Sequence, residues 1–385
     1  MLFWRVWGCA GDSATSVQLF VKAYSLTNIL PTLYIKRAEF HSIISFGNYF
    51  LISVSKNALE GVHDLNEVRM VPFKDEDCER FMEQEVKPWI EENVTDFAFD
   101  SYDGKKLQAY CAIPEKPKKA LVFVHGFCEF FGKYHELFYD FYHAGYAVFF
   151  YEQRGFGKSL REVSDKDAVY VGNFTEYVED LKLFTDEVSK MTEKKLDLML
   201  FAHSMGGCVG ALYLEKYPET FKKAVLSSPM MRMALEPRLK KVARPLCLVQ
   251  KALHRAKRLA IGQERFDERP DFKNSCALSE ARYSYQFKQR LKNAEYQTNG
   301  ATYAWVLAAL NAEKKLMQNA GRIKCPVLLC SSGNDTMVDV AGQTEFAEKS
   351  KVVKLKQFPE AKHELFNCSA EILEEYYATL LKFYE

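Results

Sequence analysis

A serine at the junction of two patterns is the first residue whose type and surroundings point to chemistry. Ser204 stands in LMLFAHSMGG, between an apolar run of strand length and a glycine-containing segment with helical spacing. A sharp turn there would hold the serine backbone in a strained conformation, and small neighbours such as Gly206 leave room for it. The N-terminus of the following helix would aim N–H groups at a developing oxyanion. Ser204 is therefore a candidate nucleophile for acyl transfer, and an ordinary helix N-cap is the alternative.

A second loop carries residue types that suit an oxyanion site. The apolar run KKALVFV leads into HGFCEFFGKY, in which Gly126 permits a close approach of the backbone to a substrate. We expect the backbone N–H of Phe127 to bind the oxyanion together with that of Met205. His125 lies far upstream of Ser204, so we interpret it as structural. A plain strand–turn is the alternative for this loop.

Chain order predicts an acid and then a histidine downstream of the serine. Asp335 follows the apolar run CPVLLCSSG, and His363 follows KVVKLKQFP. Both positions are carboxyl ends of expected strands, where open α/β sheets place their sites. Asp339 is the rival acid, but Asp335 lies nearer the strand end. Of the eight histidines only His363 lies downstream of the acid, and it is the candidate base for Ser204.

Alternating strand and helix patterns would position these residues. An Asp103-Gly104 turn indicates a hairpin within residues 96–114. Strands are expected at 118–126, 146–153, 196–204, 222–229, 325–333 and 351–359, and helices at 133–143, 172–191, 205–217, 341–350 and 369–384. This alternation predicts an α/β fold with a mostly parallel central sheet flanked by helices. From about residue 230 to about residue 320 the sequence shows helical stretches and no clear strand. This predicts a helical insertion within the α/β alternation.

Five motifs in this order carry a family resemblance: HGFCEFFGKY, YEQRGFGKS, AHSMGG, SSGNDTMVD and AKHELF. They resemble the α/β-hydrolase group of monoacylglycerol lipases, bacterial lysophospholipases and serine-aminopeptidase-like hydrolases, and the bacterial lysophospholipases most of all. The resemblance spans roughly residues 75–385 and departs from the common pattern at Ala202 and Glu152. It implies an α/β-hydrolase fold in which the insertion at about 230–320 forms a helical cap.

The resemblance also implies an activity and its residues. It implies Ser204 as nucleophile, Asp335 and His363 as its partners, and Phe127 and Met205 as oxyanion donors. The implied reaction is hydrolysis of a lipid ester such as a lysophospholipid or monoacylglycerol, with no metal or organic cofactor. A carboxylesterase of small substrates or a serine aminopeptidase is one alternative. A non-catalytic ligand-binding homologue is another, because fold alone does not establish activity.

Composition excludes several other classes of protein. The 52 basic residues nearly balance 51 acidic ones, which excludes a generally basic nucleic-acid binder. GFGKS ends like a phosphate-binding loop, but Glu152 replaces the first glycine, which excludes nucleotide binding. The apolar stretch at 40–54 is too short and too polar to span a bilayer. No C-x-x-C pair and no export signal occur, so we expect the ten cysteines to be reduced and the protein to be cytoplasmic.

The insertion begins with a strongly basic segment. Residues 229–260 contain a single acid, Glu236, and nine cations: Arg232, Arg238, Lys240, Lys241, Arg244, Lys251, Arg255, Lys257 and Arg258. One interpretation is a solvated helical face. The other is a cap whose cations contact an anionic lipid head or membrane surface, with Met230, Met231 and Met233 lining an acyl pocket.

A break near residue 70 divides the sequence into two parts. Residues 1–69 show no sustained helical or strand period, whereas residues 70–385 carry all of the motifs. The first part could be a poorly ordered extension, a membrane-contacting arm, or translated sequence upstream of a start at Met70. We expect the catalytic machinery to be independent of it.

Overall fold

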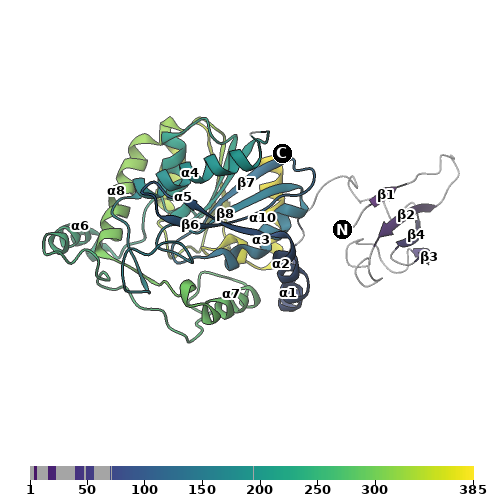
Figure 1. Cartoon of the computed structure of the whole chain (residues 1–385), viewed down its shortest axis with the longest axis horizontal. Helices are drawn as coiled ribbons and strands as arrows, with labels where there is room; N and C mark the ends of the chain where they lie inside the picture. Colours follow the sequence, from purple (N-terminus) through teal and green to yellow (C-terminus); the bar gives the residue numbers. More distant parts are fainter. Residues whose placement is uncertain are drawn as a thin grey trace. The chain divides into compact units, whose positions relative to one another are not determined.

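The computed structural model describes residues 70, 72–193 and 195–385, together with four strands among the first 55 residues. The chain divides into two compact units, Met1–Val68 and Arg69–Glu385, which are described separately (Figure 1).

The four strands of the first unit form one antiparallel sheet in the order β1-β2-β4-β3. They are β1 (Trp4–Val6), β2 (Ser16–Lys22), β3 (Phe40–Phe46) and β4 (Tyr49–Ser55). The sequence did not predict these strands, since residues 1–69 show no sustained strand period. The apolar stretch at 40–54 becomes two paired strands separated in the sequence by Gly47-Asn48, a dipeptide typical of hairpins.

An eight-stranded sheet forms the centre of the second unit, in the order β14-β13-β11-β10-β7-β8-β6-β5. Its strands are β5 (Thr95–Asp100), β6 (Lys106–Ala112), β7 (Lys119–Val124), β8 (Tyr146–Tyr151), β10 (Leu198–His203), β11 (Lys223–Ser227), β13 (Val327–Ser332) and β14 (Val353–Phe358). Strands β14 to β8 run parallel, and β5 and β6 form the predicted antiparallel hairpin at Asp103-Gly104. Every residue of β8, β10 and β13 is buried, which explains their continuous apolar runs.

Helices flank this sheet (Figure 1). They are α1 (Asp75–Phe81), the π-helical turn η4 (Met82–Val86), α2 (Lys87–Asn93), α3 (His135–His143), α4 (Phe174–Met191), α5 (Met205–Lys216), α9 (Val340–Glu348) and α10 (Ala370–Tyr384). Helix α4 begins as the sequence predicts, because the Asn173 side chain accepts a hydrogen bond from the Thr175 N–H. The mostly parallel, helix-covered sheet confirms the predicted fold class.

The segment between β11 and β13 contains α6 (Pro237–Ala252), α7 (Glu280–Lys292), β12 (Gly300–Ala301) and α8 (Tyr303–Asn319). Strand β12 was not expected; its two residues pair with β9 (Ala168–Val169). Helix α8 buries Trp305 and Leu316 in the main hydrophobic core, so the insertion also supplies one helix to the core layer. No helix in the described part of the chain is long and apolar enough to cross a bilayer.

Candidate active site

Ser204 occupies the sharp turn between β10 and α5. Its backbone lies at φ 53° and ψ −119°, a conformation that side-chain-bearing residues rarely adopt. A Cβ on Gly206 would lie 2.3 Å from the carbonyl oxygen of Val124, so only glycine fits directly after the turn. The Ser204 side chain makes no N-cap hydrogen bond, which removes the N-cap alternative.

A chain of hydrogen bonds joins Ser204 to residues far away in the sequence. His363 Nε2 lies 2.8 Å from Ser204 Oγ, and His363 Nδ1 lies 2.7 Å from Asp335 Oδ2. The other Asp335 oxygen accepts the backbone N–H groups of Met337 and Val338. Burial opposes ionisation of Asp335, but the bond to His363 and these two N–H groups outweigh it and lower the pKa of the carboxyl below its usual value.

The rival acid lies in a different set of contacts. Asp339 caps α9 by accepting the Ala341 N–H, and its other oxygen lies 3.1 Å from Arg232 Nη1. Arg232 also pairs with Glu345. The structure therefore brings Asp335, and not Asp339, to His363.

The backbone N–H groups of the two expected oxyanion donors make no hydrogen bond to other described residues. Among the described residues, no hydrogen bond uses the backbone N–H of Phe127 or of Met205. The loop that carries Phe127 is fixed by Glu129, whose carboxylate accepts the Gly126 N–H and the Tyr134 hydroxyl. Both N–H groups thus remain available to a ligand oxygen.

His125 belongs to the support of this loop. Its ring is fully buried, and Nε2 accepts the backbone N–H of Gln153 at 2.9 Å. The Gln153 side chain in turn donates to the His125 carbonyl at 2.7 Å. Burial lowers the pKa of His125 to about 4, so the ring is neutral near pH 7. The side chain holds two loops together and has no contact with Ser204.

A buried charged network beside His363 was missed at the level of the sequence. Lys133 Nζ lies 2.7 Å from Glu129 Oε1 and 2.5 Å from Glu364 Oε1. The His203 ring lies 4.9 Å from the His363 ring and 3.6 Å from Glu129, and burial lowers its pKa to about 4. The signal in the sequence was the spacing of Glu129 and Lys133, which lie four residues apart in HGFCEFFGKY. Oppositely charged residues at this spacing can pair on one face of a helix.

One cavity is lined by a member of the hydrogen-bonded cluster, and a second is lined by residues that adjoin the site in the sequence. One, of about 470 Å³, is lined by Asp335, Met233 and Leu235 among others. The other, of about 240 Å³, includes Cys128, which follows Phe127, and Glu364, which follows His363. Of the three methionines expected in an acyl pocket, Met233 lines the first cavity, whereas Met230 and Met231 are buried in the core.

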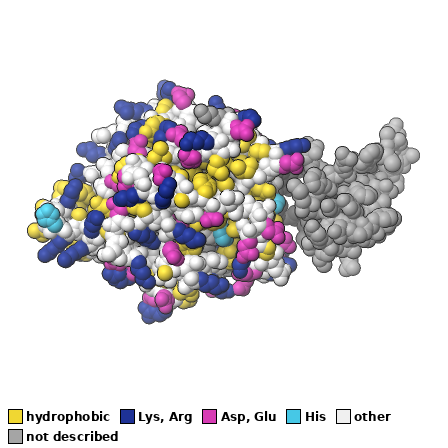
Figure 2. Space-filling view, viewed as in Figure 1, with side chains coloured by type: hydrophobic (Ala, Val, Ile, Leu, Met, Phe, Trp, Pro, Cys, Tyr) yellow, Lys and Arg dark blue, Asp and Glu magenta, His cyan; other side chains and the backbone are white. Residues whose placement is uncertain are grey.

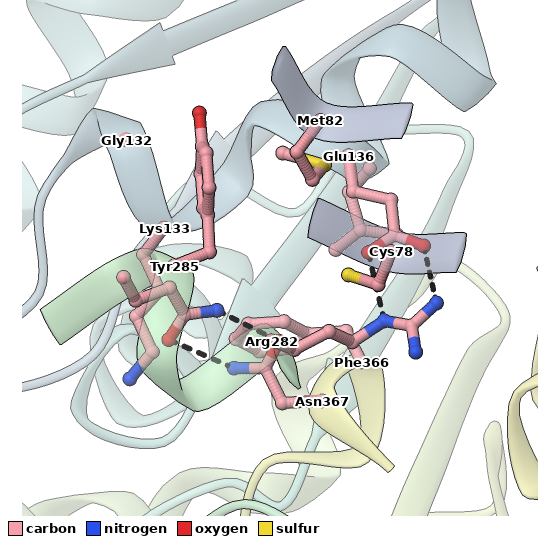
Figure 3. A pocket seen from close by; sticks show the side chains of 11 residues that line it. Cys78, Met82, Gly132, Lys133, Glu136, Arg282, Tyr285, Phe366 and Asn367 are labelled. Carbon is pink, nitrogen blue, oxygen red and sulfur yellow. Dashed lines mark hydrogen bonds and ion pairs between the residues drawn. The ribbon is translucent and has the colours of Figure 1, made fainter. Parts of the chain in front are cut away.

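A third, small pocket lies where α1, α3 and α7 meet (Figure 3). The Arg282 guanidinium donates to both oxygens of Glu136, at 2.8 and 2.6 Å. The Gln286 amide donates to the Asn367 side-chain oxygen, and the backbone carbonyl of Asn367 accepts the N–H groups of Leu278 and Ser279. This junction ties the cap helix α7 to the segment that follows His363.

In the part of the chain that the structure describes, the cysteines and acidic residues do not form a metal centre. The nine cysteines in the described part of the chain form no disulfide. Within residues 72–193 and 195–385, no group of three or more His, Cys, Asp or Glu side chains is arranged to hold a metal ion.

Comparison with known proteins identifies the family of this chain. Residues 115–368 match the family described as serine aminopeptidase, S33. The chain is 26% identical over 293 residues to the probable lysophospholipase L2 of Haemophilus influenzae, covering 74% of this chain and 90% of that protein. It is 30% identical over 238 residues to lysophospholipase L2 of Escherichia coli K12, covering 60% and 67% respectively.

A solved structure supports the same fold. The monoglyceride lipase of Saccharomyces cerevisiae, determined as a soluble variant with a substrate analogue, superimposes with a TM-score of 0.59 at 18% identity. The alignment covers 75% of this chain and 93% of the yeast chain. The family match spans well over half of the sequence. The chain therefore belongs to the serine aminopeptidase S33 family and is a hydrolytic enzyme of the α/β-hydrolase fold.

Proposed function

We propose that this protein hydrolyses carboxylic esters of lipids, of the lysophospholipid or monoacylglycerol class, through an acyl-enzyme on Ser204. The observation that carries the proposal is the unbroken chain of hydrogen bonds from Asp335 through His363 to Ser204. A serine hydroxyl is a weak nucleophile unless an adjacent base removes its proton. Here the base is within reach, and its second nitrogen is already held by a carboxylate.

The reaction follows from the positions of these groups. His363 Nε2 takes the Ser204 proton as Oγ attacks the ester carbonyl, and Asp335 stabilises the resulting imidazolium. The N–H groups of Phe127 and Met205 bind the oxyanion of the tetrahedral intermediate. His363 then donates its proton to the leaving alcohol, and the acyl group stays on Ser204. Water, activated by the same histidine, attacks the acyl-enzyme and releases the fatty acid.

Relatives and surroundings support a lipid substrate. The matched relatives are named lysophospholipases, and the yeast protein is named a monoglyceride lipase. Beside Asp335, Met233 and Leu235 give the larger, open cavity an apolar part, next to charged side chains such as Lys240, that an acyl chain could contact.

The exposed face of α6 supports contact with a lipid surface. The helix buries Cys247 against Tyr303 and Leu307, and its other side exposes large apolar residues. These are Leu239, Val242, Leu248, Val249 and Leu253, between 41% and 53% exposed. Figure 2 shows hydrophobic and basic side chains side by side over this helix. Exposed apolar residues interspersed with cations are typical of helices that lie in a membrane interface.

Five cations of this segment can be separated by their contacts. Lys257 donates to the Glu162 carbonyl and lies over the Tyr170 ring, and Arg232 pairs with Asp339, so these two serve the fold. Lys240, Lys241 and Lys251 are exposed and have no ion-pair partner within the described residues. The second group is the one we propose to meet anionic lipid.

A substrate screen tests the proposed function. Purified protein is assayed on lysophosphatidylethanolamine, 1-palmitoylglycerol, p-nitrophenyl butyrate and an aminoacyl-naphthylamide, with Ser204→Ala as the control. We expect the two lipids to be cleaved with the highest kcat/KM and the variant to be inactive on all of them. Preferred cleavage of the naphthylamide would assign a peptidase instead, and no turnover of any substrate would point to a binding protein.

A further inference from the structure

The cavity of about 240 Å³ next to Cys128 and Glu364 is walled by polar and aromatic side chains. Its lining includes Arg290 and Tyr283 from α7, and Asp271 from the preceding loop. Phe287 adds an aromatic ring stacked on Tyr283, with centroids 5.7 Å apart. The cavity is therefore lined by two cations, Lys133 and Arg290, by two anions, Asp271 and Glu364, and by an aromatic wall.

Arg290 is held rigidly but has no carboxylate partner among the described residues. Its Nε donates to the Tyr296 carbonyl at 3.1 Å, and its Nη2 donates to the Thr298 carbonyl at 2.8 Å. The guanidinium carbon lies 4.3 Å from the centroid of the Phe266 ring. No hydrogen bond of the described residues uses Nη1. Burial disfavours the charged form of Arg290 and so lowers its pKa. A bound anion would offset this desolvation cost.

The other charged groups that face the cavity are already paired or lie at its edge. Lys133 is neutralised by Glu129 and Glu364, and the second oxygen of Glu364 accepts from Asn367. Asp271 is exposed, and Asn274 donates to it. Arg290 is thus the cation available inside the cavity, and Asp271 is the anion available at its rim.

We propose that this cavity binds the head group of a zwitterionic lysophospholipid, with the phosphate on Arg290 and the ammonium group on Asp271, next to the aromatic wall of Tyr283 and Phe287. The proposal rests on the proposed function and names the head group for it. The unused Nη1 of Arg290 can donate charge-assisted hydrogen bonds to a phosphate oxygen. An ammonium group is attracted to a carboxylate such as that of Asp271.

The position of the cavity agrees with the connectivity of such a substrate. Cys128 directly follows the expected oxyanion donor Phe127, and Glu364 directly follows His363. The ester carbonyl and the phosphate of a lysophospholipid are separated only by a three-carbon glycerol unit. A substrate held by Phe127 at its carbonyl would therefore extend its head group into the neighbouring cavity.

The first test measures head-group selectivity as a ratio of kcat/KM values. Lysophosphatidylethanolamine is compared with 1-palmitoylglycerol in the same mixed micelles for wild type, Arg290→Gln and Arg290→Lys. We expect Arg290→Gln to lower the ratio about tenfold or more, since it removes a charge-assisted hydrogen bond. Arg290→Lys should keep part of the selectivity because it keeps the charge but loses the planar fork.

Lys288→Gln provides the matched control. It removes one positive charge from the same helix, where Lys288 pairs with Glu79 at an exposed position, and it should leave the ratio unchanged. A ratio that Arg290→Gln does not alter, or that Lys288→Gln alters equally, would overturn the proposal. Asp271→Asn should lower the preference for lysophosphatidylethanolamine over lysophosphatidylglycerol, which lacks the ammonium group. An unchanged preference would overturn the role of Asp271.

A second test needs no substitution. Glycerophosphoethanolamine should compete with p-nitrophenyl butyrate in the wild-type enzyme, whereas glycerol at the same concentration should not. Inhibition by inorganic phosphate of equal strength would mean a simple anion site and would overturn the head-group assignment. If the wild type cleaved no ester, the proposed function would fail. Calorimetric titration with glycerophosphoethanolamine would then test head-group binding independently of hydrolysis, and an absence of binding would overturn the proposed head-group site.

Discussion

The polar groups of the hydrogen-bonded cluster at Ser204 are buried and paired, whereas those of the cap helix α6 are exposed. In the cluster, Ser204 and His363 are 9% and 5% exposed, and each reactive atom has a partner within 2.8 Å. On α6, Lys240 and Lys241 extend into solvent beside apolar side chains such as Val249. The polar atoms of the cluster are hydrogen-bonded within the protein, whereas the exposed lysines of α6 remain available to bind a partner.

This difference indicates a division of roles. Groups held in a buried catalytic network act as a unit, so the loss of one group removes most of the rate acceleration that the whole network provides. Exposed charges act additively and are screened by salt within about 10 Å at 0.1 M ionic strength. We therefore expect the cluster to decide whether the reaction occurs and α6 to decide on which surface it occurs. The predictions below separate these two roles, from the largest effect to the smallest.

Ser204→Ala should give the largest loss. The variant should fold, because the Ser204 side chain makes no N-cap bond, and kcat should fall on the order of 10⁴-fold or more. Steady-state kinetics on p-nitrophenyl butyrate, with circular dichroism as the folding control, measure both. Turnover near that of the wild type would contradict the assignment of Ser204.

Asp335→Asn should be the next most damaging change. The amide cannot hold the His363 tautomer or stabilise its charged form, so kcat should fall on the order of 10³-fold or more. The matched change Asp339→Asn removes a carboxylate of similar sequence position that bonds to Arg232 and Ala341. It should reduce stability by about 1 kcal/mol or less while activity stays close to wild type. Equal losses in the two variants would mean that the hydrogen-bond geometry does not identify the acid.

Charge reversal on α6 should have a smaller and substrate-dependent effect. Lys240, Lys241 and Lys251 changed together to Glu should lower activity on lysophospholipid in anionic vesicles roughly tenfold, since each basic residue near such a surface contributes about 1 kcal/mol. Activity on p-nitrophenyl butyrate should stay near wild type, and high salt should reduce the difference. Reversal of Lys351, Lys354 and Lys382, on other elements, is the charge-matched control. Equal effects of the two triple variants would show that α6 has no special role.

Removal of the first unit should have the smallest effect. Residues 1–68 form a separate compact unit, and every residue of the candidate active site lies in the second one. A protein that starts at Met70 should therefore keep its melting temperature and its rate on p-nitrophenyl butyrate within about twofold, as domains with their own cores do. An unfolded or inactive truncation would show that the two units depend on each other.

The sequence was most informative where the fold constrains the backbone. The strained turn at Ser204 requires small residues after it, and parallel strands bring their carboxyl ends to one edge. Local sequence therefore placed Ser204, Asp335 and His363 correctly at strand ends, and it ranked Asp335 above Asp339. The structure then joined the three residues that the sequence had singled out.

Side-chain partners between distant segments were not predictable in the same way. Glu129 and Lys133 resemble an ordinary helical pair, and only the fold buries them beside Glu364 and His203. Arg290 looks like one of many exposed cations until the structure shows it without a carboxylate partner among the described residues. The early strands were missed because their apolar residues do not alternate regularly with polar ones.

Covalent labelling of the nucleophile tests the central claim most directly. The intact protein is treated with a fluorophosphonate, digested, and analysed by mass spectrometry, with His363→Ala and Ser204→Ala treated in parallel. The account predicts a single adduct on the peptide that contains Ser204, a strongly slowed reaction in His363→Ala, and none in Ser204→Ala. An adduct on another residue, or undiminished labelling of Ser204→Ala, would contradict the claim that Ser204 is the activated nucleophile.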